Sequence, residues 1–485
     1  MHTKPFSRTA ARSLIAAAAA LTCLAAEAAT IKIQSRDPAG YGFNDPTPVK
    51  PVGGNTGTTL GEQRWNVYRH VAKVWERNLE SDVEITVSAG WENLTCDATS
   101  AVLGSAGAWN AWILTEQGQQ PTLYPQALAN KLLGYNLSEG QPEDATGYAN
   151  VDIKTQFNAR LGQPDCLNGS PFYLGLDGNN GSEVDFAATL LHELGHGLGV
   201  SVLGVTTSTG NRFTGYPSIW ERFMYDNTAG KTWLNMTNNE RRLSAINPLK
   251  LAWIGPNTVA GAGMLAPMPV VLFASPAGNV PLADYNVSAF GPAIPKNGKL
   301  GALALVATQP GELGHGCSPF NAANAAAAKG RVPIISRGGC NFALKVKNAQ
   351  DAGAVGVILA NNAAGAFVPG GADSSIRIPS VGVTMADGAR LTAAVNAAKP
   401  YGSRTLPGQV TASFGVDMNR RAGADAFGRP LLYTPNPLIG GSSVSHFDVT
   451  AFPNLLMEPN INDDLTLEVE PPKDLTLPLL KDLGW

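Results

Sequence analysis

Several features are scarce or missing in this chain of 485 residues, and each absence excludes a class of protein. Charged residues make up only 15% and the net charge is −3, so the basic excess that favours nucleic-acid binding is missing and no nucleic-acid partner is predicted. Beyond the N-terminal region no run of 18 apolar residues occurs, so the mature protein is not expected to span a membrane. No internal period stands out, which argues against solenoids and propellers. The length and the 44% hydrophobic content instead indicate a globular protein of two or three domains.

The N-terminal segment has the features of a secretory signal peptide. Lys4, Arg8 and Arg12 supply a positive region, and an apolar, alanine-rich run follows over residues 14–26. Small residues at the end of this run suit a signal peptidase, so residues 1–28 are predicted to be removed. The mature protein is therefore expected outside the cell or in the periplasm.

Cysteine is also rare, with five residues and no C-x-x-C pair, which argues against a cysteine-ligated zinc site. Four cysteines remain after the predicted cleavage, an even number that indicates disulfides in an exported protein. Three pairings are possible. Cys96–Cys166 together with Cys317–Cys340 is favoured, because each pair then falls within one predicted domain.

Hydrophobic periodicity predicts a mixture of helices and strands. Apolar residues at helical spacing indicate a helix over residues 65–79, and strict alternation indicates a strand over 83–87. A further strand is predicted at 172–176 and a terminal helix within 475–485. Residues 200–268 read as a linker-like stretch with aromatic anchors.

The most informative segment is the sequence HELGH, which fits the pattern H-E-x-x-H. Residues 186–194 contain no glycine or proline and predict a helix, which the glycine-rich stretch 195–199 should end. Residues four apart share one face of a helix, so His192 and His196 can bind the same zinc ion. Glu193 lies beside them and is predicted to act as general base on a zinc-activated water.

A catalytic zinc usually takes three protein ligands, and elimination suggests the third. The chain has six histidines, one of which lies in the N-terminal segment. His70 falls within the predicted early helix, and His315 falls within a separate middle domain. His446 remains as the predicted third ligand, and Asp448 and Glu458 are the alternatives.

The residues around this motif resemble the metzincin family of zinc peptidases. HELGHGLG matches the first part of H-E-x-x-H-x-x-G-x-x-H, with Gly199 as the turn glycine. The usual third histidine is replaced by Val202, so the compact form of the motif is absent. In the leishmanolysin-like branch an insertion separates the glycine from a third histidine that precedes an aromatic residue, as His446 precedes Phe447. A methionine turn follows in that branch, and Met457 matches its methionine.

This resemblance covers about residues 60–199 and 430–485 and implies an α+β fold. A metzincin-like two-part catalytic domain would hold zinc in the cleft between its parts. The first part is placed at residues 29–270 and the second at 411–485, where Met457 would pack beneath the zinc ligands without binding the ion.

Residues 271–410 differ in composition and resemble a protease-associated (PA) domain. The run RGGCNF at 337–342, Lys345 and the Ala-Gly-Ala at 352–354 carry the match, which extends over about 275–400. Alternating strands and helices agree with a small α/β domain. The predicted strands are 332–336, 354–360 and 381–384, and the predicted helices are 343–352 and 386–397. The resemblance implies an inserted domain that binds or screens protein partners and substrates. The alternative is a domain that only packs against the catalytic unit.

Two functions follow from these patterns. The first is a secreted zinc endopeptidase that hydrolyses protein or peptide substrates with one catalytic Zn²⁺. The alternative is a secreted binding or adhesion protein that keeps a zinc site and uses its PA domain, with little proteolytic activity. Glu193 argues for the first, because a structural zinc site does not need it. A further hypothesis is an enzyme of the gluzincin or aspzincin class, in which a carboxylate is the third zinc ligand.

Overall fold

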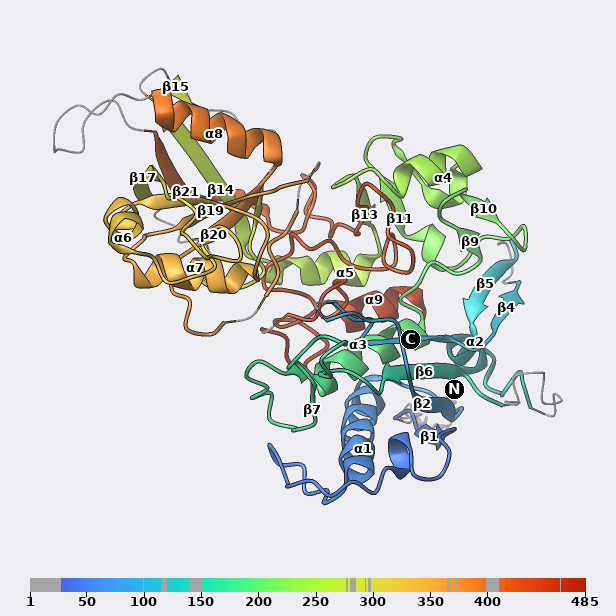
Figure 1. Ribbon diagram of the computed structural model, residues 1–485. Coiled ribbons are helices and arrows are strands. Elements are labelled where there is room, and N and C mark those ends of the chain that lie inside the picture. The colour runs from blue at the N-terminus through green and yellow to red at the C-terminus, as the bar shows by residue number, and fades with distance from the viewer. Residues whose placement is uncertain are drawn as a thin grey trace, which may run out of the picture.

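The computed structural model shows two parts joined by a pair of adjacent strands (Figure 1). It describes residues 28–485 except for residues 99, 116–119, 140–149, 276–277, 280–284, 293, 295–297, 364–366, 372, 398–409 and 463. The predicted signal peptide, apart from Ala28, lies outside the described residues.

The first part is built on a four-stranded sheet with the order β1-β2-β6-β3. Strands β1 (Ile31–Ser35), β2 (Ile85–Glu92) and β6 (Ile153–Asn158) are parallel. Strand β3 (Gly104–Ala108) runs antiparallel to β6 and forms one edge. The strand predicted at 83–87 corresponds to the beginning of β2, which is almost wholly buried.

Two helices, α1 (Leu60–Asn78) and α3 (Phe186–Leu198), pack against this sheet and against each other. Helix α1 begins with a capping box at Thr59 and buries the apolar face expected from its spacing. The ring of Tyr68 lies 5.9 Å from that of Phe186, so α1 supports the start of α3. The smaller elements here are η1 (Gly42–Asn44), β4 (Ala111–Leu114), β5 (Thr122–Pro125), α2 (Gln126–Leu133), β7 (Phe172–Tyr173) and β8 (Val184–Asp185).

The segment predicted as linker-like, residues 200–268, is instead a folded part of the same hydrophobic core. The side chains of Trp220, Trp233 and Trp253 are fully buried in it. Its elements are β9 (Val205–Thr206), β10 (Asn211–Arg212), η2 (Trp220–Arg222), β11 (Met224–Asp226), β12 (Lys231–Thr232), η3 (Trp233–Asn235), α4 (Asn238–Ser244), β13 (Leu251–Trp253), α5 (Pro256–Gly261) and η4 (Ala262–Met264). Hydrophobic periodicity did not predict these elements, because most of them are only two or three residues long, too short to show a repeat of apolar positions.

The second part is an eight-stranded sheet with the order β15-β14-β21-β17-β18-β19-β20-β16. Its strands are β14 (Pro267–Ser275), β15 (Gly278–Asn279), β16 (Tyr285–Val287), β17 (Lys299–Leu305), β18 (Val332–Ser336), β19 (Val357–Ala360), β20 (Ser380–Val383) and β21 (Thr411–Arg421). Its helices are α6 (Ala322–Ala328), α7 (Phe342–Asp351) and α8 (Met385–Ala397). The strands and helices predicted for the middle domain are all present, with small shifts of their ends.

This second part has hydrophobic clusters of its own, separate from the core of the first part. The chain enters it along β14 and leaves along β21, which pair antiparallel from Pro267 opposite Arg421. The boundary predicted at residues 410/411 falls just before β21, although this strand belongs to the eight-stranded sheet and not to the core of the first part. The ends of the inserted segment are therefore adjacent.

Residues after β21 return to the first core and end in helix α9 (Thr476–Leu483), which lies beside α5 (Figure 1). This is the predicted terminal helix. The structure joins Cys96 to Cys166 and Cys317 to Cys340, so the favoured disulfide pairing is confirmed and no bridge crosses between the two parts.

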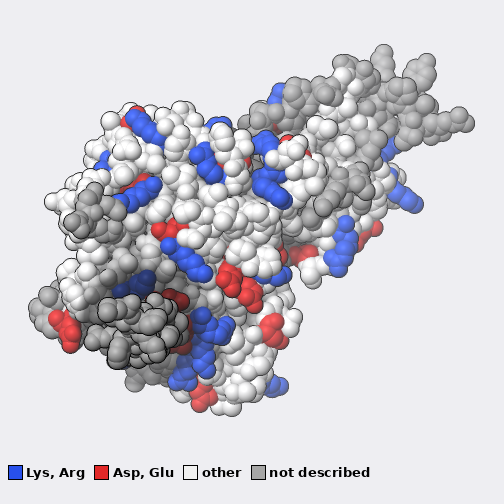
Figure 2. All heavy atoms as spheres, turned by 180° about the vertical axis from the view of Figure 1, so that it is seen from behind, with Lys and Arg blue, Asp and Glu red and all other residues white. Residues whose placement is uncertain are grey.

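The surface carries charges of both signs. Figure 2 shows basic and acidic side chains interspersed among uncharged residues on one face. Within the described ranges, the structure contains no helix with the length and apolar character needed to cross a bilayer.

Candidate metal centre

Helix α3 positions the first two histidines. Asp185 caps its N-terminus, since the Asp185 carboxylate accepts the backbone N–H of Ala188 in the first turn. The helix continues to Leu198, beyond the first glycines of the stretch predicted to end it, and Gly199 ends it with a φ of 132°. His192 and His196 lie four residues apart on one face of this helix.

His446 reaches the same point from a loop 250 residues after His196. Its Nε2 atom lies 3.1 Å from that of His196, which in turn lies 3.1 Å from the Nε2 of His192. Among the described residues, these three histidines form the one group of potential ligand atoms that all lie within 4.8 Å of one another. The alternatives Asp448 and Glu458 accept hydrogen bonds within their own loop and are not part of the group.

Each imidazole bonds a backbone carbonyl through Nδ1. The pairs are His192 with Leu456 (2.6 Å), His196 with Val200 (2.6 Å) and His446 with Ser442 (2.8 Å). A carbonyl oxygen can only accept, so we assign the proton to Nδ1 and a lone pair to Nε2 in every ring. A tetrahedral zinc with Zn–N bonds of about 2.0–2.1 Å separates its nitrogen ligands by about 3.3 Å. Both Nε2 separations from His196, at 3.1 Å, are close to this value, and the three potential ligand atoms lie within 4.8 Å of one another.

Burial keeps these imidazoles uncharged. It lowers the pKa of His192 to about 3 and that of His196 to about 4, and it holds the pKa of His446 well below its usual value. Proximity of the other histidines adds to the effect on His192 and His446. The neutral imidazole is the form that binds a metal, so the ligand set is already in its binding form at neutral pH.

Glu193, between the two histidines of the helix, is buried. Burial raises the pKa of its carboxyl to about 8, although the backbone N–H of Ala106 in β3 lowers it in part. A cation at the three Nε2 atoms would favour the ionised carboxylate. This carboxyl therefore has the balance of forces that proton transfer near neutral pH requires.

Met457 is fully buried and packs against α3. A Cβ atom placed on Gly195 would lie only 2.8 Å from the Met457 sulfur, so helix and methionine are in direct contact. The carbonyl of Met457 accepts the N–H of Phe447 at 2.8 Å. The loop around Met457 (residues 455–458, the methionine loop) therefore links helix α3 to the residue that follows His446.

Some contacts of the site have no signature in the sequence. The carbonyls of Leu456, Val200 and Ser442 hold the imidazoles, and any residue type can supply a carbonyl. Val202, which occupies the usual third-ligand position, donates its N–H to Ser445 Oγ at 3.1 Å. It thus contacts the segment that carries His446 without being a ligand.

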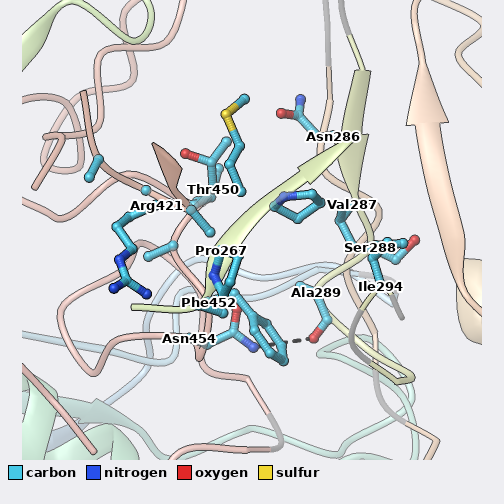
Figure 3. A pocket seen from close by; sticks show the side chains of 18 of the residues that line it. Pro267, Asn286, Val287, Ser288, Ala289, Ile294, Arg421, Thr450, Phe452 and Asn454 are labelled. Atoms are coloured by element: carbon cyan, nitrogen blue, oxygen red, sulfur yellow. Dashed lines mark hydrogen bonds between the residues drawn. The ribbon is translucent and has the colours of Figure 1, made fainter. Parts of the chain in front are cut away.

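A large cavity of about 920 Å³ lies between the two parts of the chain. The beginning of β14, strand β16, residues 420–427 and most of residues 449–454 contribute to its lining. Figure 3 shows the hydrogen bond of 3.5 Å that crosses it from Asn454 Nδ2 to the Ala289 carbonyl. None of the three converging histidines lines this cavity, so its size does not mark the metal centre.

Comparison with known proteins identifies one part of the chain. Residues 301–391 match the PA domain family, which confirms the prediction of a PA domain within the inserted part. No curated protein matches the chain.

Several solved peptidase structures align with part of the chain. A zinc aminopeptidase, BSAP of Bacillus subtilis, is 21% identical over 33% of this chain and 36% of its own, with a TM-score of 0.22. An aminopeptidase of Aneurinibacillus sp. strain AM-1 is 19% identical over 41% of this chain and 42% of its own, with a TM-score of 0.20. A peptidase M28 precursor of Shewanella amazonensis is 15% identical over 47% of this chain and 50% of its own, with a TM-score of 0.24.

The chain thus spans half or less of the length of these structures, too little to assign a fold to the remainder. None of the three is described as a metzincin. The likeness of the first part to that family remains a prediction from the sequence motif.

Proposed function

We propose that this protein is a secreted zinc endopeptidase of metzincin type, with the metal held by His192, His196 and His446. The observation that carries the proposal is the convergence of three neutral imidazoles with their Nε2 lone pairs facing one another. No hydrogen-bond donor satisfies these lone pairs within the triad, and a divalent cation would. Glu193 beside them favours a catalytic role over a structural one.

A zinc ion bound there would polarise the scissile carbonyl and lower the pKa of a bound water to about 7. Glu193 accepts a proton from the attacking water and returns it to the leaving amine, since its buried carboxyl can carry a proton near neutral pH. The Ala106 N–H keeps this carboxyl turned toward β3 between the two transfers. Met457 packs against the helix and holds the ligands in place without entering the reaction.

The position of β3 supports an extended peptide as substrate. This strand lies against α3, and its Ala106 contacts the general base. In the described part of the chain, no strand pairs with the outer edge of β3. An extended peptide that added to this edge would use the unpaired backbone groups and pass the metal centre.

The alternative is a secreted binding protein that uses its PA domain and has little activity. The separate core of the inserted part favours a unit that can interact on its own. The two functions differ in what happens when Glu193 is changed, because binding through the PA domain does not depend on that carboxyl.

The test combines metal analysis with cleavage of casein and of quenched peptides blocked at both ends. Purified protein is expected to contain one zinc and to cut blocked peptides internally. Glu193→Gln should keep the zinc and lose about 10²–10⁴-fold in turnover, because the amide cannot accept a proton. Glu183→Gln is the matched control and should behave like the wild type. A zinc-loaded wild type without cleavage would support the binding protein, and cleavage only of peptides with free N-termini would contradict the endopeptidase.

A further inference from the structure

Two carboxyl groups close to the metal centre are buried without a positive partner. Glu458 is 1% exposed and Asp474 is 2% exposed, and neither forms an ion pair with a described basic residue. Burial raises the pKa of both, against the hydrogen bonds that each accepts. Burying a carboxyl group in this way is unfavourable unless hydrogen bonds compensate, and both of these carboxyls accept backbone hydrogen bonds.

Both carboxyls bind backbone N–H groups of the methionine loop. Glu458 accepts the N–H of Leu455 at 2.8 Å, which closes the loop on itself. Asp474 comes from a different segment, just before helix α9, and accepts the N–H of Leu456 at 2.6 Å. Its other oxygen accepts the N–H of Thr476 at 2.6 Å, so the beginning of α9 fixes this carboxylate.

The residue that Asp474 holds is also the one that orients His192. Leu456 gives its N–H to Asp474 and receives the Nδ1 hydrogen of His192 on its carbonyl, each at 2.6 Å. Only two backbone atoms of Leu456, Cα and C, lie between the nitrogen and the oxygen that make these two bonds. A shift of Leu456 at its nitrogen therefore moves the carbonyl that the imidazole depends on.

His192 is the histidine for which this matters most. His196 and His446 each bond a carbonyl four residues away in sequence, so local structure sets their rings. The carbonyl for His192 belongs to a residue 264 positions away. Its tautomer and orientation therefore depend on how firmly the methionine loop is held.

We infer that Asp474 is a positioning residue of the metal centre, which acts through Leu456 to fix the Nδ1–H tautomer and the orientation of His192. Asp474 does not touch the metal or the substrate. The inference rests on the proposed zinc site, but not on peptidase activity. Groups that orient a metal-binding histidine from outside the ligand set typically contribute 10- to 100-fold in metal affinity.

The test compares Asp474→Asn with Asp482→Asn. Asp482 lies on α9 and accepts the backbone N–H groups of Asn257 and Thr258 at 2.7 and 3.1 Å, without contacting the methionine loop. Asp474→Asn replaces one acceptor oxygen by a donor and should lower Zn²⁺ affinity 10- to 100-fold in a chelator competition. Asp482→Asn should keep wild-type affinity. Long-range ¹H–¹⁵N spectra of the metal-free proteins should show altered His192 ring signals in Asp474→Asn alone.

Unchanged Zn²⁺ affinity and ring signals in Asp474→Asn would overturn the inference, and so would an equal loss of affinity in Asp482→Asn. Absence of Zn²⁺ binding by the wild type would overturn the metal site itself. Intact Zn²⁺ binding without peptide cleavage would overturn only the proposed function.

A measurement on the wild type decides the matter if Asp474→Asn does not fold. If the hydrogen bonds from Asp474 through Leu456 to His192 strengthen Zn²⁺ binding, then bound Zn²⁺ must strengthen these hydrogen bonds in turn, because such coupling is reciprocal. Amide hydrogen exchange at Leu456 should slow on Zn²⁺ loading by more than exchange at Thr258, which Asp482 holds. Equal changes at the two amides would contradict the role of Asp474.

Discussion

The contact between Gly195 and Met457 gives the sharpest test of how the site is packed. A Cβ atom on Gly195 would lie 2.8 Å from the Met457 sulfur and 3.4 Å from its methyl carbon. Ordinary carbon contacts are about 3.5–4.0 Å, so Gly195→Ala forces the methionine to move. Met457 is fully buried, and its movement displaces close-packed neighbours at a cost of about 1–3 kcal/mol. Against this, alanine is favoured over glycine in a helix by about 1 kcal/mol.

Gly195→Ala is therefore expected to lower the free energy of unfolding by about 1 kcal/mol in the wild type. In a Met457→Ala background the clash is absent, so the same change should raise it by about 1 kcal/mol. The sign of the effect reverses, and the coupling energy of the cycle is about 2 kcal/mol.

The assay is urea unfolding, monitored by tryptophan fluorescence, of the four metal-free proteins: the wild type, Gly195→Ala, Met457→Ala and the double variant. All nine tryptophans lie outside residues 267–421, so the signal reports the first part of the chain alone. If Gly195→Ala stabilised the protein equally in both backgrounds, the packing of Met457 against α3 would be refuted.

Further predictions concern pH, the disulfides and the inserted domain. The folded-state pKa of His446 lies below its unfolded value, so its contribution to stability is complete above about pH 6.5 and is lost as the pH falls toward the folded pKa. The pKa of Glu193 is raised, so its effect on stability has the opposite sign, and the wild type is therefore compared with His446→Gln, in which Glu193 is unchanged. Between pH 6.5 and 5 the free energy of unfolding of metal-free His446→Gln should change less steeply than that of the wild type, by about 1.4 kcal/mol per pH unit. Equal slopes of the two proteins in urea unfolding would be inconsistent with a buried neutral imidazole at His446. Replacing Cys96 and Cys166 by alanine opens a bridge with a sequence separation of 70 and should cost about 4 kcal/mol in the tryptophan-detected transition. The same change at Cys317 and Cys340 should leave that transition in place, and a comparable loss would show that the two parts unfold together. Ala422 N–H donates to the Ala266 carbonyl at 2.9 Å, so a short Gly/Ser turn can replace residues 267–421. The shortened protein should still bind zinc and cleave small peptides, whereas failure to fold would make the PA domain part of the catalytic core.

The sequence alone determined what depends on short-range spacing. Helix α3 and the common face of His192 and His196 follow from a glycine-free apolar run with histidines four apart. Strand β18 was predicted with its observed bounds at 332–336, because a buried run between turn residues has one local solution. Even the cysteine pairing followed from the division into domains, since each bridge closes within one unit.

Only the tertiary structure decided which distant segments meet. Residues 200–268 form short elements that no local hydrophobic periodicity predicts. They are stabilised by packing in the core around Trp220 and Trp253, whose ring centroids lie 4.5 Å apart. Elimination pointed to His446, but its approach to His196 depends on the adjacent ends of the inserted part. The bond from His192 to the Leu456 carbonyl was beyond sequence reasoning altogether. Every residue has a carbonyl, so only the folded chain, held there by buried polar groups, selects which one orients the ligand.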